Sequence, residues 1–233
     1  MDVIRLDILP DPLIKCPNKK VYSPSEDSFL LIDYFKENID EISFDGIDLK
    51  IIDYILDMGT GTGIIAIYLQ LLKSKNPSFK PRIIASDLME EAIKCAKNNE
   101  DLNSINEEIT FLHSDLFKSF PNNLKSSINI IIFNPPYLPS SELMKSVENK
   151  WNIDYSWDGG KKGFETSLRF LEDAKMFLNL EEDHYIYLIS SSRTDSVEFE
   201  KSIQNLDYNC EIVKKKHYFF EDIVLNRLTH VRY

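Results

Sequence analysis

Residues 50–75, KIIDYILDMGTGTGIIAIYLQLLKSK, decide the fold of this chain. The mostly apolar residues 50–56 predict a buried strand, and residues 64–75 have the length and apolar content of a helix. Between them lies DMGTGTG (57–63), where three of the chain's seven glycines alternate with other residues. Glycines at this place permit a tight turn and let the backbone approach a ligand at the N-terminus of the following helix. We therefore expect a ligand-binding turn between a strand and a helix.

The alternation of strand and helix continues through the chain. Apolar segments predict strands at 82–86, 108–113, 127–133 and 184–190, followed by two strands near the C-terminus. Amphipathic segments predict helices from about 90 to 101, at 165–179 and at 196–206. Strands joined by helices pair in parallel through right-handed crossovers. The sequence therefore predicts an α/β fold with a mostly parallel sheet, whose ligands bind at the carboxyl ends of the strands.

The residues before this alternation predict a lead-in and a helix. Residues 1–20 contain three prolines and should be irregular or extended. In VYSPSEDSFLLID (21–33), Ser23 and Glu26 have the spacing of a capping box, with Pro24 at the first helical position. We expect a single domain over residues 1–233, with its lead-in and capping helix in residues 1–45.

Composition excludes several classes of protein. The chain has 233 residues, 43% of them hydrophobic, and a formal net charge of -11, which argues against a broad phosphate-binding surface. No apolar run approaches the roughly 20 residues of a membrane helix. Charged residues, such as Asp2 and Arg5, interrupt any signal-peptide core. We therefore expect a cytoplasmic, or also nuclear, protein without membrane or nucleic-acid partners.

The three cysteines predict neither a disulfide framework nor a metal site. Cys16, Cys95 and Cys210 are far apart, odd in number and form no CxxC pair. This usage is typical of a reducing compartment.

Acidic residues follow the predicted strands. Asp87 ends the second strand, where a carboxylate can accept both hydrogen bonds from a ribose diol, although it could also cap the next helix. For Asp115, after the third strand, ligand contact and capping are equally open. The GxGxG spacing places Ile64 where a dinucleotide-binding fingerprint needs glycine, which disfavours a nicotinamide or flavin cofactor.

The segment INIIIFNPPYLP (128–139) places Asn134 at the carboxyl end of a buried strand. The Asn134 side-chain oxygen and the Pro135 carbonyl can accept the two hydrogens of a planar NH2 group, which leaves its lone pair free to face a reaction partner. Pro135 and Pro136 fix this backbone and donate no competing N–H. Tyr137 can stack on the planar group and exclude water. The segment therefore predicts a site that can orient a planar nitrogen, such as an amide or an adenine amine, for reaction.

Four stretches together resemble a known family. The acid followed by GxGxG resembles motif I of class I S-adenosylmethionine-dependent methyltransferases, and NPPY resembles the tetrad of those acting on planar nitrogens. VYSPSEDSFLLID (21–33) is similar to VYEPAEDSFLLLDAL, and WDGGKKGFETSLRFL (157–171) is similar to a WAGG segment. Both belong to the HemK/PrmC-like release-factor glutamine methyltransferases, in their short eukaryotic and archaeal branch. The chain departs from this pattern at Asp158, where the family has alanine.

The resemblance implies a Rossmann-like class I methyltransferase fold: a seven-stranded, mostly parallel sheet with one antiparallel C-terminal strand and helices on both faces. It implies S-adenosylmethionine as the cofactor, no metal, and catalytic roles for Asn134, Pro135 and Tyr137. The implied cofactor contacts are Tyr22, Ser28, Asp57, Gly59, Gly61, Asp87, Leu88, Asp115, Leu116 and Asn134. The implied substrate contacts are Asn134, Pro135, Pro136, Tyr137, Gly159 and Gly160.

The resemblance further implies an enzyme that methylates the glutamine of the Gly-Gly-Gln loop in a class I translation termination factor. It also implies a heterodimer with a small zinc-binding activator, which pairs with an exposed sheet edge beside ITFLH (109–113). Three alternatives stay open: an adenine amino methyltransferase acting on DNA or RNA, which the net charge disfavours, a protein lysine methyltransferase, and a non-catalytic scaffold.

Overall fold

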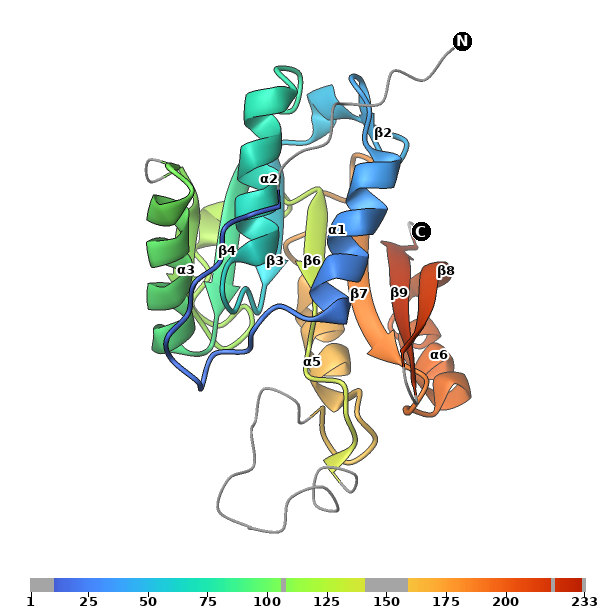
Figure 1. The fold of residues 1–233 in the computed structure, drawn as a ribbon. Helices are drawn as coiled ribbons and strands as arrows, with labels where there is room; N and C mark the ends of the chain where they lie inside the picture. The colour runs from blue at the N-terminus through green and yellow to red at the C-terminus, as the bar shows by residue number, and fades with distance from the viewer. Residues whose placement is uncertain (1–10, 106–107, 141–158, 219–220, 232–233) are drawn as a thin grey trace.

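A seven-stranded sheet forms the centre of the computed structural model, which describes residues 11–105, 108–140, 159–218 and 221–231 (Figure 1). The strand order is β5-β4-β3-β6-β7-β9-β8. The strands are β3 (Tyr54–Met58), β4 (Arg82–Asp87), β5 (Thr110–His113), β6 (Ile130–Phe133), β7 (Tyr185–Ser191), β8 (Tyr208–Tyr218) and β9 (Glu221–His230). Pairing is parallel from β5 to β7, and β9 runs antiparallel to both of its neighbours. The predicted fold class is confirmed.

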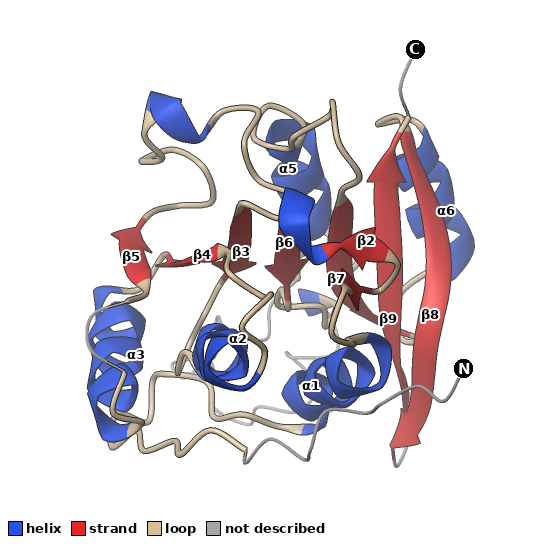
Figure 2. Cartoon of the chain, turned by 90° about the horizontal axis from the view of Figure 1, so that it is seen from above, coloured by secondary structure: helices blue, strands red, loops and turns tan. Residues whose placement is uncertain are grey.

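Helices cover both faces of this sheet (Figure 2). One face carries α1 (Glu26–Asn38), α2 (Ile64–Lys75) and α3 (Glu90–Leu102), and the other carries α5 (Glu165–Ala174) and α6 (Ser196–Gln204). The remaining elements are the hairpin β1 (Ser43–Phe44) and β2 (Ile47–Asp48), and the short 3-10 helices η1 (Leu49–Ile51) and η2 (Asn122–Leu124). None of the helices among the described residues is both long and apolar enough to span a membrane.

Alternation along the central strands divides the core into two layers. Ile130 and Ile132 of β6 pack into the cluster that includes the buried faces of α1 and α2. Ile131 and Phe133 pack into the cluster that includes α5 and α6. Successive side chains of a strand point to opposite faces of the sheet, so a strand that is apolar at every position must be covered on both sides. This burial fixes where β6 ends, and therefore where the segment after it begins.

The predicted start of the first helix is wrong. The helix α1 begins at Glu26, and its N-cap is Ser25, which makes no side-chain capping bond. The Ser25 hydroxyl donates to the Glu26 carboxylate instead. The backbone at Ser25 is extended, and the Tyr22 hydroxyl before it reaches Asp27 in the first turn. The hydrogen bond between Tyr22 and Asp27 therefore takes the place of the capping box predicted for Ser23 and Glu26.

Two other boundaries differ from the prediction. Residues 49–51 form η1 rather than the start of a strand, and the hairpin β1–β2 precedes it. The helix predicted over 165–179 ends at Ala174, because Leu178 forms a parallel β-bridge with Ile128. Neither interaction is visible in local hydrophobic periodicity.

The N-terminal segment runs beside α3 before it enters α1 (Figure 1). The Asn103 side chain accepts a hydrogen bond from the Leu13 backbone N at 2.9 Å, and Asn99 accepts from Lys15 N at 2.8 Å. This path pairs Cys16 with Cys95, whose Cα atoms are 5.9 Å apart. The sequence analysis did not anticipate this contact, because it joins residues 79 positions apart in sequence.

Candidate active site

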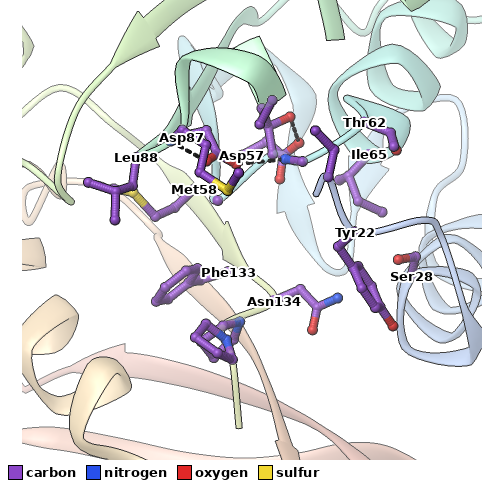
Figure 3. Close-up of a pocket in the computed structure, with 18 of the residues that line it drawn as sticks. Tyr22, Ser28, Asp57, Met58, Thr62, Ile65, Asp87, Leu88, Phe133 and Asn134 are labelled. Carbon is purple, nitrogen blue, oxygen red and sulfur yellow. Dashed lines mark hydrogen bonds between the residues drawn. The ribbon is translucent and has the colours of Figure 1, made fainter. Parts of the chain in front are cut away.

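A cavity of about 390 Å³ opens at the carboxyl ends of β3, β4 and β6 (Figure 3). The strand order places it where the chain leaves β5 and crosses back to the other side of β3. Such topological switch points are where open α/β sheets bind their ligands. The volume falls in the range of roughly 300–1,000 Å³ that is usual for small-molecule sites.

The glycine turn between β3 and α2 forms one wall of this cavity. Gly63 is the N-cap of α2 and has a φ of +83°, in the left-handed region. A Cβ at Gly63 would lie 2.9 Å from the Ala96 Cβ of α3. The third glycine of the motif therefore allows α2 to begin directly against α3, which brings the turn over the pocket.

Asp57 is buried beneath this turn and is held there by hydrogen bonds. Its Oδ2 accepts from the Thr60 hydroxyl at 2.6 Å and from the Ala66 backbone N at 3.2 Å. Burial raises the pKa of Asp57 to about 7; the two hydrogen bonds act against this rise, and the charge of Asp87 adds to it. A carboxylate in this condition is stabilised by a cation placed beside it. Asp57 therefore fits a ligand ammonium group.

Asp87 links the end of β4 to the glycine turn. Its Oδ2 accepts from Gly61 N at 2.9 Å, and its Oδ1 accepts from Met89 N at 2.8 Å. The N-cap residue of α3 is Met89, so Asp87 does not occupy the capping position that the sequence left open. Burial raises the pKa of Asp87. Leu88, which follows, is 64% exposed at the cavity and offers an apolar surface to a flat ring.

Asp115 follows β5, lines the cavity and is paired with two cations. Lys118 Nζ lies 2.5 Å from Oδ2, and Arg169 Nη2 lies 3.3 Å from Oδ1. The Lys118 hydrogen bond and the charges of both cations hold the pKa of Asp115 below its usual range. Asp115 is therefore ionised and can accept a hydrogen bond from a ligand amine.

Asn134 follows β6, and its side-chain oxygen is a buried hydrogen-bond acceptor. Its side-chain Oδ1 has no hydrogen-bond partner among the described residues. Its amide projects into the space in front of Tyr22 (Figure 3). A buried polar atom without a partner costs about 1–3 kcal/mol. The site is therefore prepared to accept an N–H from a ligand.

Tyr137 and Tyr22 meet on one buried carboxylate. The Tyr22 hydroxyl donates to Asp27 Oδ2 at 2.9 Å, and the Tyr137 hydroxyl donates to the same oxygen at 3.3 Å. Burial, and next the charge of Asp27, raise the pKa of both tyrosines. The two phenols therefore remain protonated donors. This network joins the N-terminal segment, α1 and the segment after β6 at the pocket.

The structure brings the sequence-predicted residues together at this cavity. The lining includes every predicted cofactor contact and the whole NPPY segment: Tyr22, Ser28, Asp57, Gly59, Gly61, Asp87, Leu88, Asp115, Leu116, Asn134, Pro135, Pro136 and Tyr137. Lining residues that sequence reasoning missed include Val21, Asp27, Thr60, Ile65, Ser114, Phe133, Thr166 and Arg169. Most of these residues lie within three positions of a predicted residue in the sequence. That proximity is the signal from which they could have been predicted.

Gly159 and Gly160 do not line the cavity. They lie behind NPPY, where Gly159 N donates to Leu138 O at 3.0 Å and Ser140 N donates to Gly160 O at 2.8 Å. A Cβ at Gly159 would be 2.7 Å from the Pro136 carbonyl oxygen. The structure thus gives these glycines a packing role, and their predicted substrate contact remains a prediction. Asp158 lies outside the described residues.

No group of three or more His, Cys, Asp or Glu side chains is arranged to hold a metal ion in the part of the chain that the structure describes.

Comparison with known proteins identifies similar sequences. Residues 39–151 match the family model of the methyltransferase small domain. A protein of Methanocaldococcus jannaschii that carries the name protein N5-glutamine methyltransferase is 32% identical over 206 residues, which are 88% of this chain and 90% of that protein. Methyltransferase HEMK2 of Mus musculus is 24% identical over 181 residues, covering 77% of this chain and 76% of the mouse protein.

Solved structures share the fold. One is a chain of the Mtq2–Trm112 complex of E. cuniculi, described as responsible for methylation of the termination factor eRF1; its TM-score is 0.60, at 20% identity over 91% of this chain and 99% of that chain. Another is the N-terminal domain of human METTL16 with SAH, with a TM-score of 0.63, 14% identity, and 94% and 76% covered. At these identities the likeness establishes the fold alone.

Proposed function

Because this chain belongs to the family of protein N5-glutamine methyltransferases, we propose that it methylates the glutamine side-chain amide in the Gly-Gly-Gln loop of a class I translation termination factor. The cofactor is S-adenosylmethionine, which supplies an electrophilic methyl group on a sulfonium. The acidic groups fit it: Asp57 suits its ammonium, Asp87 its ribose hydroxyls and Asp115 its adenine amine. Leu88 offers an apolar face to the adenine ring.

The observation that carries the proposal is the unsatisfied Oδ1 of Asn134 at the end of β6. A glutamine amide nitrogen is a poor nucleophile because its lone pair is delocalised into the carbonyl. If Asn134 Oδ1 accepts one amide hydrogen and the Pro135 carbonyl accepts the other, the lone pair is left facing the methyl group. Orientation of this kind lowers the barrier without requiring a strong base.

Tyr137 forms an aromatic wall beside the position proposed for the substrate amide. Its side chain is 6% exposed, and its hydroxyl is fixed by Asp27, so the ring cannot swing away from the pocket. A fixed aromatic face beside the amide can stack on it and exclude water. After transfer, the proton of the methylated nitrogen is lost to solvent, and no residue of the chain is needed to store it.

Two open alternatives are less well supported. A lysine ammonium is tetrahedral and does not need a pair of acceptors set for a planar group. An adenine amine would fit the acceptors, but a nucleic acid would also need cations along the approach. Among the described lining residues, Arg169 is the one cation, and it is paired with Asp115.

We further propose that a small zinc-binding activator protein pairs with the β5 edge of the sheet. β5 is an edge strand made of Thr110, Phe111, Leu112 and His113, with no charged Lys, Glu or Asp along it. The opposite edge, β8, carries Lys214, Lys215 and Lys216, and lysines of this kind block edge-to-edge pairing. The chain of E. cuniculi with the same fold was solved in complex with Trm112, which supports a partner of this kind.

The decisive experiment is mass spectrometry of a class I termination factor after incubation with S-adenosylmethionine and this chain, with and without the activator. We expect one added methyl group on the loop glutamine. Asn134→Ala should reduce the rate about 100-fold or more, as misplaced reacting groups do. Asn209→Ala, which removes an exposed amide on β8, is the matched control and should be unaffected.

Cofactor binding, measured by calorimetry, distinguishes the outcomes. Intact cofactor binding with no glutamine methylation in either incubation contradicts the proposed substrate and directs attention to adenine amines. Methylation only when the activator is present makes this chain the catalytic half of an obligate pair.

A further inference from the structure

Asp27 places a buried negative charge in the pocket, and the methyl-transfer geometry described above does not use that charge. It stands in the first turn of α1, is 2% exposed and lines the cavity. Its neighbours come from three separate parts of the chain: Tyr22 from the N-terminal segment, Ser28 from α1 and Tyr137 from the segment after β6.

Among the residues that the structure describes, every hydrogen-bond donor to Asp27 is neutral. Oδ2 accepts from the hydroxyls of Tyr22 at 2.9 Å and Tyr137 at 3.3 Å. Oδ1 accepts from the Ser28 backbone N at 2.6 Å and the Ser28 hydroxyl at 3.2 Å. No lysine or arginine within the described ranges forms an ion pair with Asp27. Its charge is therefore solvated by dipoles but not neutralised.

Four hydrogen bonds from neutral donors stabilise this carboxylate but leave its net negative charge in place, so a cation that enters the pocket is attracted to it. A buried carboxylate is stable only when it is paired or fully hydrogen-bonded. Burial and the charge of Asp27 raise the pKa of Tyr22 and of Tyr137, so neither phenol gives up a proton. The network therefore holds the negative charge of Asp27 beside the Tyr22 hydroxyl. The Asn134 amide projects toward the same tyrosine (Figure 3).

We propose that Asp27 is a positioning residue that favours the cationic methyl donor over its neutral product. Its carboxylate attracts the sulfonium of S-adenosylmethionine and, through the hydroxyl of Tyr137, fixes the aromatic face beside Asn134. Transfer breaks the sulfur–methyl bond and forms the nitrogen–methyl bond, which leaves a neutral thioether. Asp27 then no longer attracts the sulfur, and product release is favoured. The identity of the cofactor is the part of this inference that rests on the proposed function.

Calorimetric titration with S-adenosylmethionine and with S-adenosylhomocysteine tests the inference, because the two differ in charge at sulfur. Asp27→Asn keeps the shape of the side chain and removes its charge. We expect it to weaken the binding of S-adenosylmethionine about tenfold, equivalent to about 1.4 kcal/mol. Binding of S-adenosylhomocysteine should change much less. Asp33→Asn, an exposed acid on the same helix, should alter neither affinity.

Equal weakening of both ligands by Asp27→Asn would mean that the residue only supports the fold, and the inference would be overturned. If Asp27→Asn does not fold, Tyr137→Phe gives a second test. It removes one neutral donor from the carboxylate and should increase the preference for S-adenosylmethionine over S-adenosylhomocysteine; an unchanged or smaller preference speaks against the inference. Neither titration involves the acceptor substrate, so a failure of the proposed substrate leaves this test intact.

Discussion

Asp57 is a buried carboxylate that we propose binds the ammonium group of the cofactor. In the absence of a ligand, burial raises its pKa to about 7, so the carboxylate is largely protonated at mildly acidic pH. An ammonium group beside it favours the ionised form and lowers that pKa. Below pH 7, cofactor binding must therefore expel a proton. By linkage, affinity falls as pH falls, by at most about tenfold per pH unit.

We predict that the affinity for S-adenosylmethionine decreases steadily from pH 7 to pH 5.5, measured by calorimetry in one buffer system. The cofactor's own amino group titrates at about 7.7–8.0 and stays charged throughout this range. Asp57→Asn cannot titrate, so it should bind more weakly at pH 7 and lose most of the pH dependence. An equally steep dependence in Asp57→Asn would show that another group carries the proton.

At the scale of single residues, the sequence predicted side chains whose chemistry follows from their position. Asp57, Asp87 and Asn134 each stand at or near the end of an apolar strand, and parallel strands of one sheet end at the same edge. The contact between Asp27 and Tyr137 escaped prediction because the two residues lie 110 positions apart. Only the packing of α1 over the strand ends reveals that contact.

The turn formed by residues 159–163 supports NPPY from behind. Gly163 has a φ of +87°, and a Cβ there would lie 2.7 Å from the Tyr137 carbonyl oxygen. Gly159 approaches the Pro136 carbonyl in the same way. The turn therefore lies against the backbone of Pro136 and Tyr137. We expect a shift of this turn to displace the neighbouring acceptors of Asn134 and Pro135, which together form the amide clamp.

Gly163→Ala is predicted to slow methyl transfer by more than its loss of stability explains. Gly46, in the β1–β2 turn, has almost the same φ of +86° with no atom within 4 Å of its Cβ position, so Gly46→Ala is a matched control. Gly46→Ala should lose roughly 1–3 kcal/mol of stability from left-handed strain, measured by denaturant unfolding. Gly163→Ala should lose more, because its Cβ also meets the Tyr137 carbonyl oxygen. Only Gly163→Ala should also lower kcat, by about tenfold or more, since displacement of the clamp misaligns the reacting groups. Equal kcat values in the two folded variants would rule out the support role.

Elements with strong periodicity were predictable, and elements decided by tertiary contacts were not. The helix predicted over 64–75 is α2 as observed, because its residues are apolar enough to be buried on several faces. The edge position of β5 was also expected and is confirmed. The hairpin β1–β2 was missed because it has two residues in each strand, too few for any alternation to show.

The charge of the whole molecule bears on the choice between protein and nucleic-acid substrates. The net charge is -11, and the lysine run of β8 lies at the sheet edge opposite β5. Two of its members are already paired, Lys214 with Glu37 and Lys215 with Asp222, each at 2.6 Å. These two ion pairs reduce the positive charge that the lysine run offers to a nucleic acid. At a net charge of -11, a polyanion approaching the molecule would meet net repulsion.

We therefore predict that oligonucleotides rich in adenine, single- or double-stranded, gain no methyl group under conditions where the termination factor is fully methylated. The test compares incorporation of labelled methyl into DNA, RNA and the protein substrate, with this chain alone and with its activator. Low salt is the stringent condition, because each phosphate contact strengthens binding as salt falls. Methylated adenine at a rate comparable to that of glutamine would mean that the two acceptors of Asn134 and Pro135 serve either planar nitrogen. If no adenine is methylated even at low salt, the acceptors of Asn134 and Pro135 select only the geometry of the nitrogen. The net charge of the whole molecule then selects protein over nucleic acid as the substrate.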